Sequence, residues 1–256
     1  MALILCIETA TEVCSVALFL NENLLGIKES SARNVHSAML TTFIGELLNS
    51  TDYGYIDLDA IAVSMGPGSY TGLRIGVATA KGLCYALDKP LIAVSTLQAM
   101  AFGINYELRI TNRSEVELGG ANYESGNVIP DPGSRISYLI CPMIDAKRME
   151  VYCAVYDQKG KELREIQAEI IDESSFQDFL ADNTVVFGGE GAGKCKPILG
   201  DHPNAVFLDN FRTSAQFMNM LALKKFHLQE FKDLAYFEPF YLKDFVAGKP
   251  RVKGLN

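Results

Sequence analysis

The sequence predicts an α/β fold in which two copies of one domain follow each other, each with a mixed β-sheet. First, short β-type runs alternate with helical patterns, which is typical of helices that cover a sheet. Second, the order of three strands, helix, strand and helix occurs twice along the 256 residues. Glu8 after the first strand then corresponds to Asp145 in the second copy. In each copy, an antiparallel meander would lead into parallel β-α-β units.

The elements of the first copy follow from hydrophobic periodicity and turn residues. Continuous or alternating apolar runs that end at polar turns predict strands. Apolar residues at three- and four-residue spacing predict helices. The expected strands are 3–7, 13–20, 24–28, 60–64 and 91–94, and the expected helices are 34–49, 71–87 and one that begins at 96.

The second copy begins after a polar stretch. Residues 105–135 are rich in Asn, Gly, Ser and Glu, so we expect a loop insertion or connector there. Beyond it, we expect strands at 138–145, 150–156, 162–170, 185–187 and 206–208 and helices at 173–180 and 214–231. The expected units are an N-terminal domain (1–104), the connector (105–135), a C-terminal domain (136–235) and a tail that packs back on the fold (236–256).

Composition and charge exclude several classes of protein. The chain is 48% hydrophobic and 21% charged, as in soluble globular proteins. Its net charge of −8 argues against a protein that wraps nucleic acid alone, but leaves room for acting on RNA beside a basic partner. The six cysteines form no C-x-x-C pair, which favours reduced thiols in the cytoplasm. Neither a signal peptide nor a membrane span is indicated.

The repeated element order resembles the actin/Hsp70/sugar-kinase (ASKHA) architecture. That resemblance implies a cleft between the two copies that can hold a nucleotide. Two hairpin turns and an acidic residue after the first strand would face this cleft. No cofactor is required under this interpretation, although weak binding of ATP or ADP is compatible with it.

Three segments together resemble the TsaB (YeaZ) family. They read ILCIETATEVCSVAL at 4–18, GPGSYTGLRIG at 66–76 and PLIAVSTL at 90–97, with EPFYL at 238–242 in the tail. The family is a non-catalytic subunit of the bacterial machinery that makes threonylcarbamoyladenosine in tRNA. The resemblance implies pairing with the catalytic paralogue TsaD and with the ATPase TsaE, a homodimer as a further option, and contact with tRNA only through the complex.

The residues also indicate that this chain is not the transferase. The catalytic paralogue carries H-x-x-x-H on the helix that follows the strand at 91–94, and two His at i and i+4 can reach one metal. Thr96 and Met100 stand at those positions here. His36, His202 and His227 lack metal-ligand spacing. We therefore expect no metal site and no catalytic residues.

Partner contacts are expected on the first two helices. One stripe consists of His36, Leu40, Phe43 and Leu47, and small residues recur at Gly72, Gly76 and Ala80. The alternative is that these stripes are core. If they form the interface, Phe43→Asp or Ala80→Glu would abolish association while leaving the monomer folded.

Two glycine-rich segments and the first strand's end provide candidate nucleotide or anion contacts. Gly68 and Ser69 precede a helix whose N-terminus would attract anions, although helix capping and close packing explain them better. Glu8 and Thr9 end the first strand, where Glu8 is better explained as a carboxylate that caps its own turn. The remaining candidates are Gly189, Gly191 and Lys194.

Residues 188–194 match G-x-x-x-x-G-K, the start of a phosphate-binding loop, but Cys195 replaces the Ser or Thr that would bind Mg²⁺. Gly200 and Pro203 would end the following helix within about two turns. We therefore interpret the segment as a glycine turn in which only Lys194 touches a ligand. The alternative functions are an actin-like phosphotransferase or ATPase and, less favoured, a glycoprotease-like hydrolase, for which a G-x-S-x-G elbow is missing.

Overall fold

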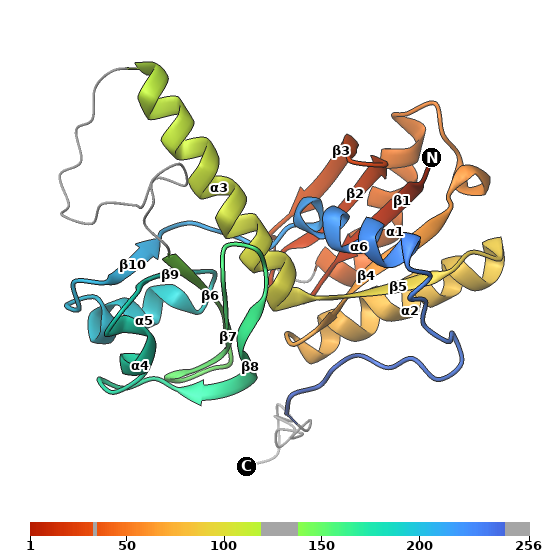
Figure 1. Cartoon of the computed structure of the whole chain (residues 1–256). Helices are drawn as coiled ribbons and strands as arrows, with labels where there is room; N and C mark the ends of the chain where they lie inside the picture. Colours follow the sequence, from red (N-terminus) through yellow and green to blue (C-terminus); the bar gives the residue numbers. More distant parts are fainter. Residues whose placement is uncertain (33–34, 119–137, 244–256) are drawn as a thin grey trace, which may run out of the picture.

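The computed structural model describes residues 1–32, 35–118 and 138–243. Within these ranges the chain forms two five-stranded mixed sheets, with helices on both faces of each (Figure 1). The strand orders are β3-β2-β1-β4-β5 and β10-β9-β6-β7-β8. Read from its other edge, the second sheet has the same order as the first. The predicted α/β architecture of two repeated units is therefore confirmed.

In each sheet, three antiparallel strands continue into two parallel ones. The first sheet contains β1 (Leu3–Glu8), β2 (Cys14–Leu20), β3 (Asn23–Ser30), β4 (Ala60–Gly66) and β5 (Leu91–Ser95). The second contains β6 (Tyr138–Asp145), β7 (Glu150–Tyr156), β8 (Glu162–Ile170), β9 (Thr184–Gly188) and β10 (Ala205–Leu208). The central strands β1 and β6 end at Glu8 and Asp145, the two carboxylates that the sequence comparison matched.

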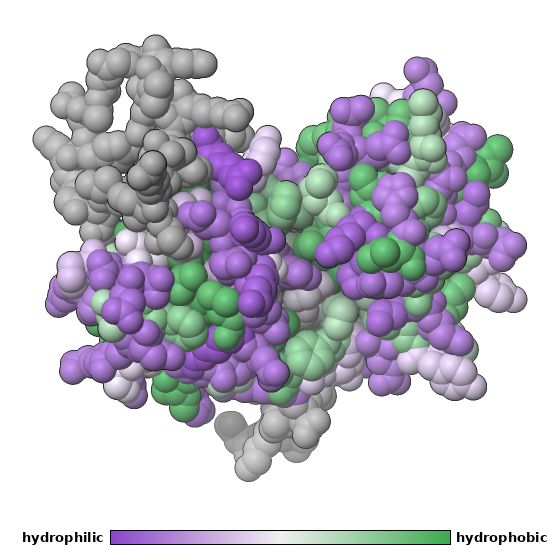
Figure 2. All heavy atoms as spheres, viewed as in Figure 1, coloured by the Kyte–Doolittle hydropathy of each residue, from purple (hydrophilic) through white to green (hydrophobic). Residues whose placement is uncertain are grey.

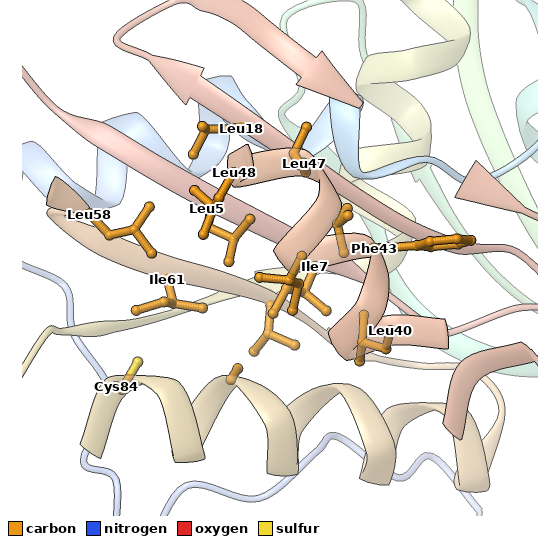
Figure 3. Packing of buried hydrophobic residues seen from close by; sticks show 14 of the residues in the cluster. Leu5, Ile7, Leu18, Leu40, Phe43, Leu47, Leu48, Leu58, Ile61 and Cys84 are labelled. Atoms are coloured by element: carbon orange, nitrogen blue, oxygen red, sulfur yellow. The ribbon is translucent and has the colours of Figure 1, made fainter. Parts of the chain in front are cut away.

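Helices α1 (Val35–Asn49) and α2 (Tyr70–Leu87) pack side by side on one face of the first sheet. Leu5, Ile7 and Leu18 project from that face into a cluster with the apolar stripes of both helices (Figure 3). Alternate strand residues point to the opposite face, as the pleat requires. A short 3-10 helix, η1 (Tyr55–Asp57), lies between α1 and β4.

The two halves exchange helices. Helix α3 (Thr96–Leu118) follows β5 but packs on β6 and β7 of the second sheet. The 3-10 helix η2 (Ala215–Met218) and helix α6 (Asn219–His227) follow β10 but pack on the first sheet. Helices α4 (Gln177–Leu180) and α5 (Ala192–Leu199) cover the other face of the second sheet. Each hydrophobic core is therefore completed by a helix from the other half of the sequence.

Three expectations about the helices are wrong. Residues 105–118 were expected in a polar loop, but α3 continues through them, and residues 119–135 lie outside the described ranges. The helix expected at 173–180 is confined to Gln177–Leu180. The helix expected at 214–231 starts as η2 and ends at His227. The exact domain boundaries stay a prediction.

The described part of the tail, up to Lys243, lies against the fold. The amide of Phe240 donates to the carbonyl of Met65 at 2.7 Å, and the rings of Tyr70 and Tyr241 lie 4.8 Å apart. Lys243 then pairs with Glu150 in the second half. The tail therefore runs from the first half of the molecule to the second.

The face of the molecule in view in Figure 2 is predominantly polar. Figure 2 shows hydrophilic residues over most of the face in view, with apolar residues in small groups between them. No helix in the described ranges has the length and apolar character needed to cross a membrane. All six cysteines are buried and unpaired.

Candidate functional site

A cleft of about 1010 Å³ lies between the two halves, at the ends of β1 and β6. The first half contributes the β1–β2 turn, the start of α2 and the segment around His36. The second half contributes the β6–β7 turn, Tyr152 and Glu190. The resemblance to the actin/Hsp70/sugar-kinase architecture implied a cleft between the two copies, and the hydrogen bonds and charges of the residues around it determine what this cleft can bind.

Glu8 is buried and caps its own turn. Its Oε1 accepts a hydrogen bond of 2.6 Å from the amide of Ala10. Burial raises the pKa of the Glu8 carboxyl to about 7, opposed by hydrogen bonds from Ala10 and Ser64 and increased by the charge of Glu190. The turn-capping interpretation is therefore confirmed. A carboxyl held in this way is poorly placed to orient a metal-bound phosphate.

A second buried carboxyl joins the two halves. The hydroxyls of Thr11 and Thr213 share a hydrogen bond of 2.5 Å, and Thr213 lies 3.5 Å from Oε1 of Glu190. Burial also raises the pKa of Glu190. The sequence did not reveal this junction, because its members are far apart in the chain and belong to no motif.

The start of α2 is capped from within the chain. Oγ of Ser69 accepts from the amide of Gly72, and the amide of Ser69 donates to the carbonyl of Ala10 at 2.6 Å. A Cβ at Gly68 or Gly72 would overlap the carbonyl oxygens of Ala10 or Thr9. These glycines therefore allow α2 to approach the β1–β2 turn. The capping and packing interpretation of this segment is confirmed.

The loop at 188–191 is also packed rather than open. Gly189 has φ of +110°, and the amide of Gly191 donates to the carbonyl of Met143 at 3.0 Å. A Cβ at Gly191 would lie 2.9 Å from the carbonyl carbon of Ile144. Helix α5 then runs for only 8 residues. The predicted glycine turn and short helix are confirmed.

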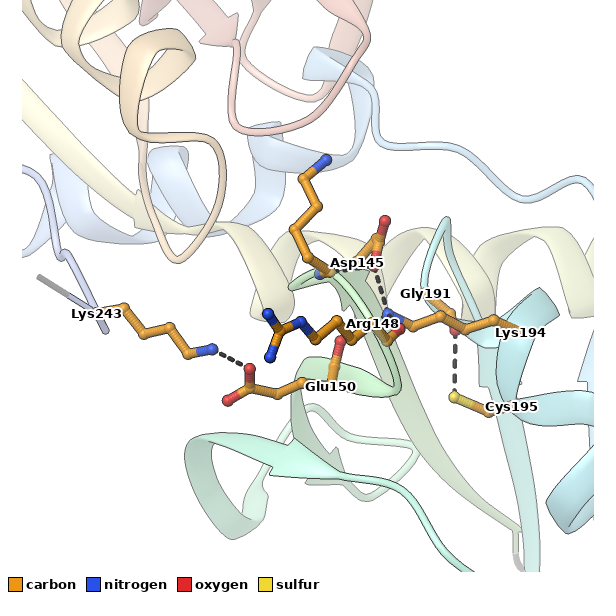
Figure 4. Close-up of polar contacts among 8 residues, drawn as sticks. Asp145, Arg148, Glu150, Gly191, Lys194, Cys195 and Lys243 are labelled. Carbon is orange, nitrogen blue, oxygen red and sulfur yellow. Dashed lines mark hydrogen bonds and ion pairs between the residues drawn. The ribbon is translucent and has the colours of Figure 1, made fainter. Parts of the chain in front are cut away.

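Lys194 requires a correction. It was expected to be the residue of this loop that touches a ligand, but it forms an ion pair with Asp145 (Figure 4). Its ammonium also donates to the carbonyls of Arg148 and Glu150 at 2.8 and 2.7 Å. Since these three contacts use its three donors, Lys194 holds the β6–β7 turn in place.

The residues expected at a partner interface are mostly core. Leu40, Phe43, Leu47 and Ala80 are buried between the helices and the first sheet. Gly72 and Gly76 face Thr9, whose hydroxyl a Cβ at Gly76 would overlap. Only His36 reaches the surface, in the wall of the cleft. Phe43→Asp or Ala80→Glu would consequently unfold the monomer, and the expectation that it stays folded is wrong.

A different face of α1 and α2 is exposed. Small or polar residues at three- and four-residue spacing form it. We call this set the helix-pair face: Ala38, Thr41, Thr42, Ala78, Gly82 and Tyr85. Tyr85 is 85% exposed, and a Cβ at Gly82 would meet no atom within 4 Å other than its chain neighbours and the adjacent backbone of its own helix. This face has room for a closely packed neighbour.

Thr96 and Met100, the positions where the resemblance places the paralogue's metal-binding His pair, are both buried in the core. Among the described residues, no group of three or more His, Cys, Asp or Glu side chains could hold a metal ion.

Comparisons with known proteins give a consistent picture. The family model described as TsaD, tRNA N6-adenosine threonylcarbamoyltransferase, matches residues 18–113. The tRNA threonylcarbamoyladenosine biosynthesis protein TsaB of Escherichia coli is 29% identical over 96% of both chains. The protein of the same name from Bacillus subtilis is 32% identical over 64% of this chain and 58% of its own.

Transferases are similar over a shorter part. The tRNA N6-adenosine threonylcarbamoyltransferase of Anaplasma marginale is 36% identical over 38% of this chain and 31% of its own. Among solved structures, YeaZ from Pseudomonas aeruginosa superposes with a TM-score of 0.69 at 25% identity, over 94% of this chain and all of that one.

Proposed function

We propose that the chain is a TsaB (YeaZ)-type protein, a non-catalytic subunit in the biosynthesis of threonylcarbamoyladenosine in tRNA. The observation that carries the proposal is the extent of similarity. It covers 96% of both chains for the E. coli biosynthesis protein but 38% of this chain for the A. marginale transferase. The chain would pair with a TsaD-like transferase and support a TsaE-like ATPase.

The state of the cleft supports a non-catalytic role. Glu8 caps its own turn, and Lys194 is fully engaged by Asp145 and two carbonyls. The amides of Ser69 and Gly191 are bonded within the chain. Groups that would bind phosphate or Mg²⁺ in a phosphotransferase are therefore already in use. We propose that no cofactor is required, that ATP and ADP bind weakly, and that the purified chain with ATP and Mg²⁺ shows no turnover.

The helix-pair face is the surface we assign to the partner. The TsaD family model matches residues 18–113, which include α1 and α2. A partner with the same fold would therefore offer the equivalent helices, as in a two-fold interface between like subunits. Small residues such as Ala78 and Gly82 allow close helix packing, and exposed Tyr85 is the type of side chain that anchors interfaces. The same face would pair two copies when no partner is present.

The test uses Ala78→Glu with Ala181→Glu as its matched control. Ala78 is on the helix-pair face, whereas Ala181, which is also exposed, lies at the end of α4. We expect Ala78→Glu to prevent co-purification with the TsaD-like transferase and to leave the melting temperature unchanged, because no core residue is touched. Ala181→Glu should co-purify normally. Co-purification of the Ala78→Glu variant at the wild-type level would refute the assignment of this face.

A further inference from the structure

The β6–β7 turn concentrates positive charge on an otherwise acidic chain. Lys147 and Arg148 lie on the turn, Lys194 reaches it from α5, and Lys243 reaches it from the tail. Asp145 and Glu150 are the carboxylates paired with Lys194 and Lys243 (Figure 4). Four cationic side chains therefore meet two paired carboxylates, on a protein whose net charge is −8.

The excess charge belongs to Lys147 and Arg148. Both side chains are exposed, and neither forms an ion pair within the described residues. Lys194 holds the backbone beneath them in place, because its ammonium donates hydrogen bonds to the carbonyls of Arg148 and Glu150. The turn therefore exposes two cationic side chains that have no ion pair within the described residues, on a backbone that Lys194 holds in place.

The backbone conformation makes this choice of residues unusual. Lys147 has φ of +75° and Arg148 has φ of +50°, in the left-handed region where Gly and Asn are preferred. A long side chain at such positions destabilises the folded state. Backbone strain of this kind is kept mainly at sites where the residue has a function. Charge presented at this turn is a reason for keeping Lys and Arg there.

We propose that Lys147 and Arg148 bind the phosphate backbone of RNA, with tRNA as the substrate under the proposed function on which this inference rests. Phosphate contacts of this kind position a nucleic acid without reading its sequence. The cleft beside the turn also contains Glu12 and Glu190, which would repel phosphate. The phosphate backbone of the RNA would therefore pass over the outside of the turn rather than enter the cleft.

Two observations favour RNA over an acidic protein. One exposed large apolar side chain, Ile170, lies opposite Glu150 on β8, but residues 146–149 of the turn itself expose none, whereas protein interfaces need an apolar centre. The described tail ends at Lys243, which is held at Glu150 beside the turn. The sequence of 244–256 carries Lys249, Arg251 and Lys253 against one acidic residue.

The test measures binding of a labelled, unmodified tRNA transcript to the full chain at salt concentrations from about 50 to about 200 mM. In the variant K147N/R148G, the turn receives residues that suit its backbone, so we expect equal or higher thermal stability. We expect RNA affinity to fall by at least about tenfold, with the slope of log K against log salt shallower by about 1.4 to 1.8. K147Q/R148Q, which keeps both Cβ atoms, should weaken binding similarly.

The matched control is K159Q/K161Q, which removes the same charge from the turn at the other end of β7 and should bind RNA as the wild type does. The proposal would be overturned if both turn variants bound RNA with wild-type affinity, or if the control lost as much affinity as they do. It would also be overturned if the wild type bound no RNA at about 50 mM salt, or if polyglutamate displaced the labelled RNA better than unlabelled RNA does. Co-purification with the TsaD-like transferase is measured in parallel. If the wild type did not co-purify with the transferase, the proposed function would be refuted. If it did, but the turn variants bound RNA as the wild type does, only this inference would be refuted.

Discussion

The turns that follow β1 and β6 occupy corresponding places in the repeated fold but differ in their electrostatics. Glu8 is buried and has no cationic partner among the described residues, and burial raises its pKa to about 7. Asp145 is exposed; partial burial acts to raise its pKa, but the hydrogen bonds and charges of Lys194 and Lys147 together outweigh this, and the pKa is lowered. The turn after β1 is therefore packed between the two halves, whereas the turn after β6 is an exposed, charged surface.

The largest effect is expected from two glycines near the starts of α2 and α5. A side chain at Gly72 would overlap the Thr9 carbonyl, whereas a Cβ at Gly193 meets nothing within 4 Å. We expect Gly72→Val to lower the free energy of unfolding by about 3 kcal/mol through overpacking. Gly193→Ala should raise it by about 0.5 to 1 kcal/mol through helix propensity. Urea denaturation measures the free energy of unfolding of both variants. If the two substitutions changed it equally, the start of α2 would not be more tightly packed than the start of α5.

An effect of up to the same size, but dependent on pH, is expected from Glu8→Gln. Because the folded pKa of Glu8 is raised, the folded state binds more protons than the unfolded state between pH 4.5 and about 7. Wild-type stability should therefore fall as pH rises through this window. Gln removes the titration, so the variant should be more stable than the wild type at pH 8 by up to about 3 kcal/mol, with similar stability near pH 4.

Denaturation curves at several pH values decide this prediction. A constant difference between wild type and Glu8→Gln from pH 4 to 8 would contradict the raised pKa. Asp145→Asn is the corresponding change in the second turn. Since the pKa of Asp145 is lowered, its stabilising contribution should be present above pH 4 and lost as pH falls further, the opposite sign to Glu8.

The smallest effect is expected from the two lysines of α5. Lys194 holds the β6–β7 turn through Asp145 and two carbonyls, whereas Lys196 pairs with Asp209 at the surface. We expect Lys194→Met to cost about 1 to 2 kcal/mol and Lys196→Met less than about 0.5 kcal/mol. Thermal melts at low and high salt would measure the difference. Identical melting temperatures for the two variants would show that Lys194 does not stabilise the turn.

Local chemistry could be predicted from the sequence, whereas choices that depend on distant residues could not. The cap at Ser69, the turn held by Glu8 and the short α5 all depend on residues within a few positions of each other. The repeated strand order was also correct, because the pattern of apolar runs occurs twice.

An apolar stripe does not say what covers it. Leu40, Phe43 and Leu47 were assigned to a partner interface but pack on the chain's own sheet. The exchange of α3 and α6 between halves likewise depends on contacts between distant segments. Residues 105–118 are polar, and polar composition predicted a loop where α3 continues as a helix. The engagement of Lys194 by the turn after β6 was missed for the same reason.

The central claim is that this chain supports the transfer of threonylcarbamoyl groups without performing it. The most direct measurement is formation of threonylcarbamoyladenosine in a tRNA transcript by the TsaD-like transferase and the TsaE-like ATPase, with and without this chain. We expect modification only when the chain is present, and none from the chain alone. Modification by the chain alone, or undiminished modification in its absence, would contradict the proposed function.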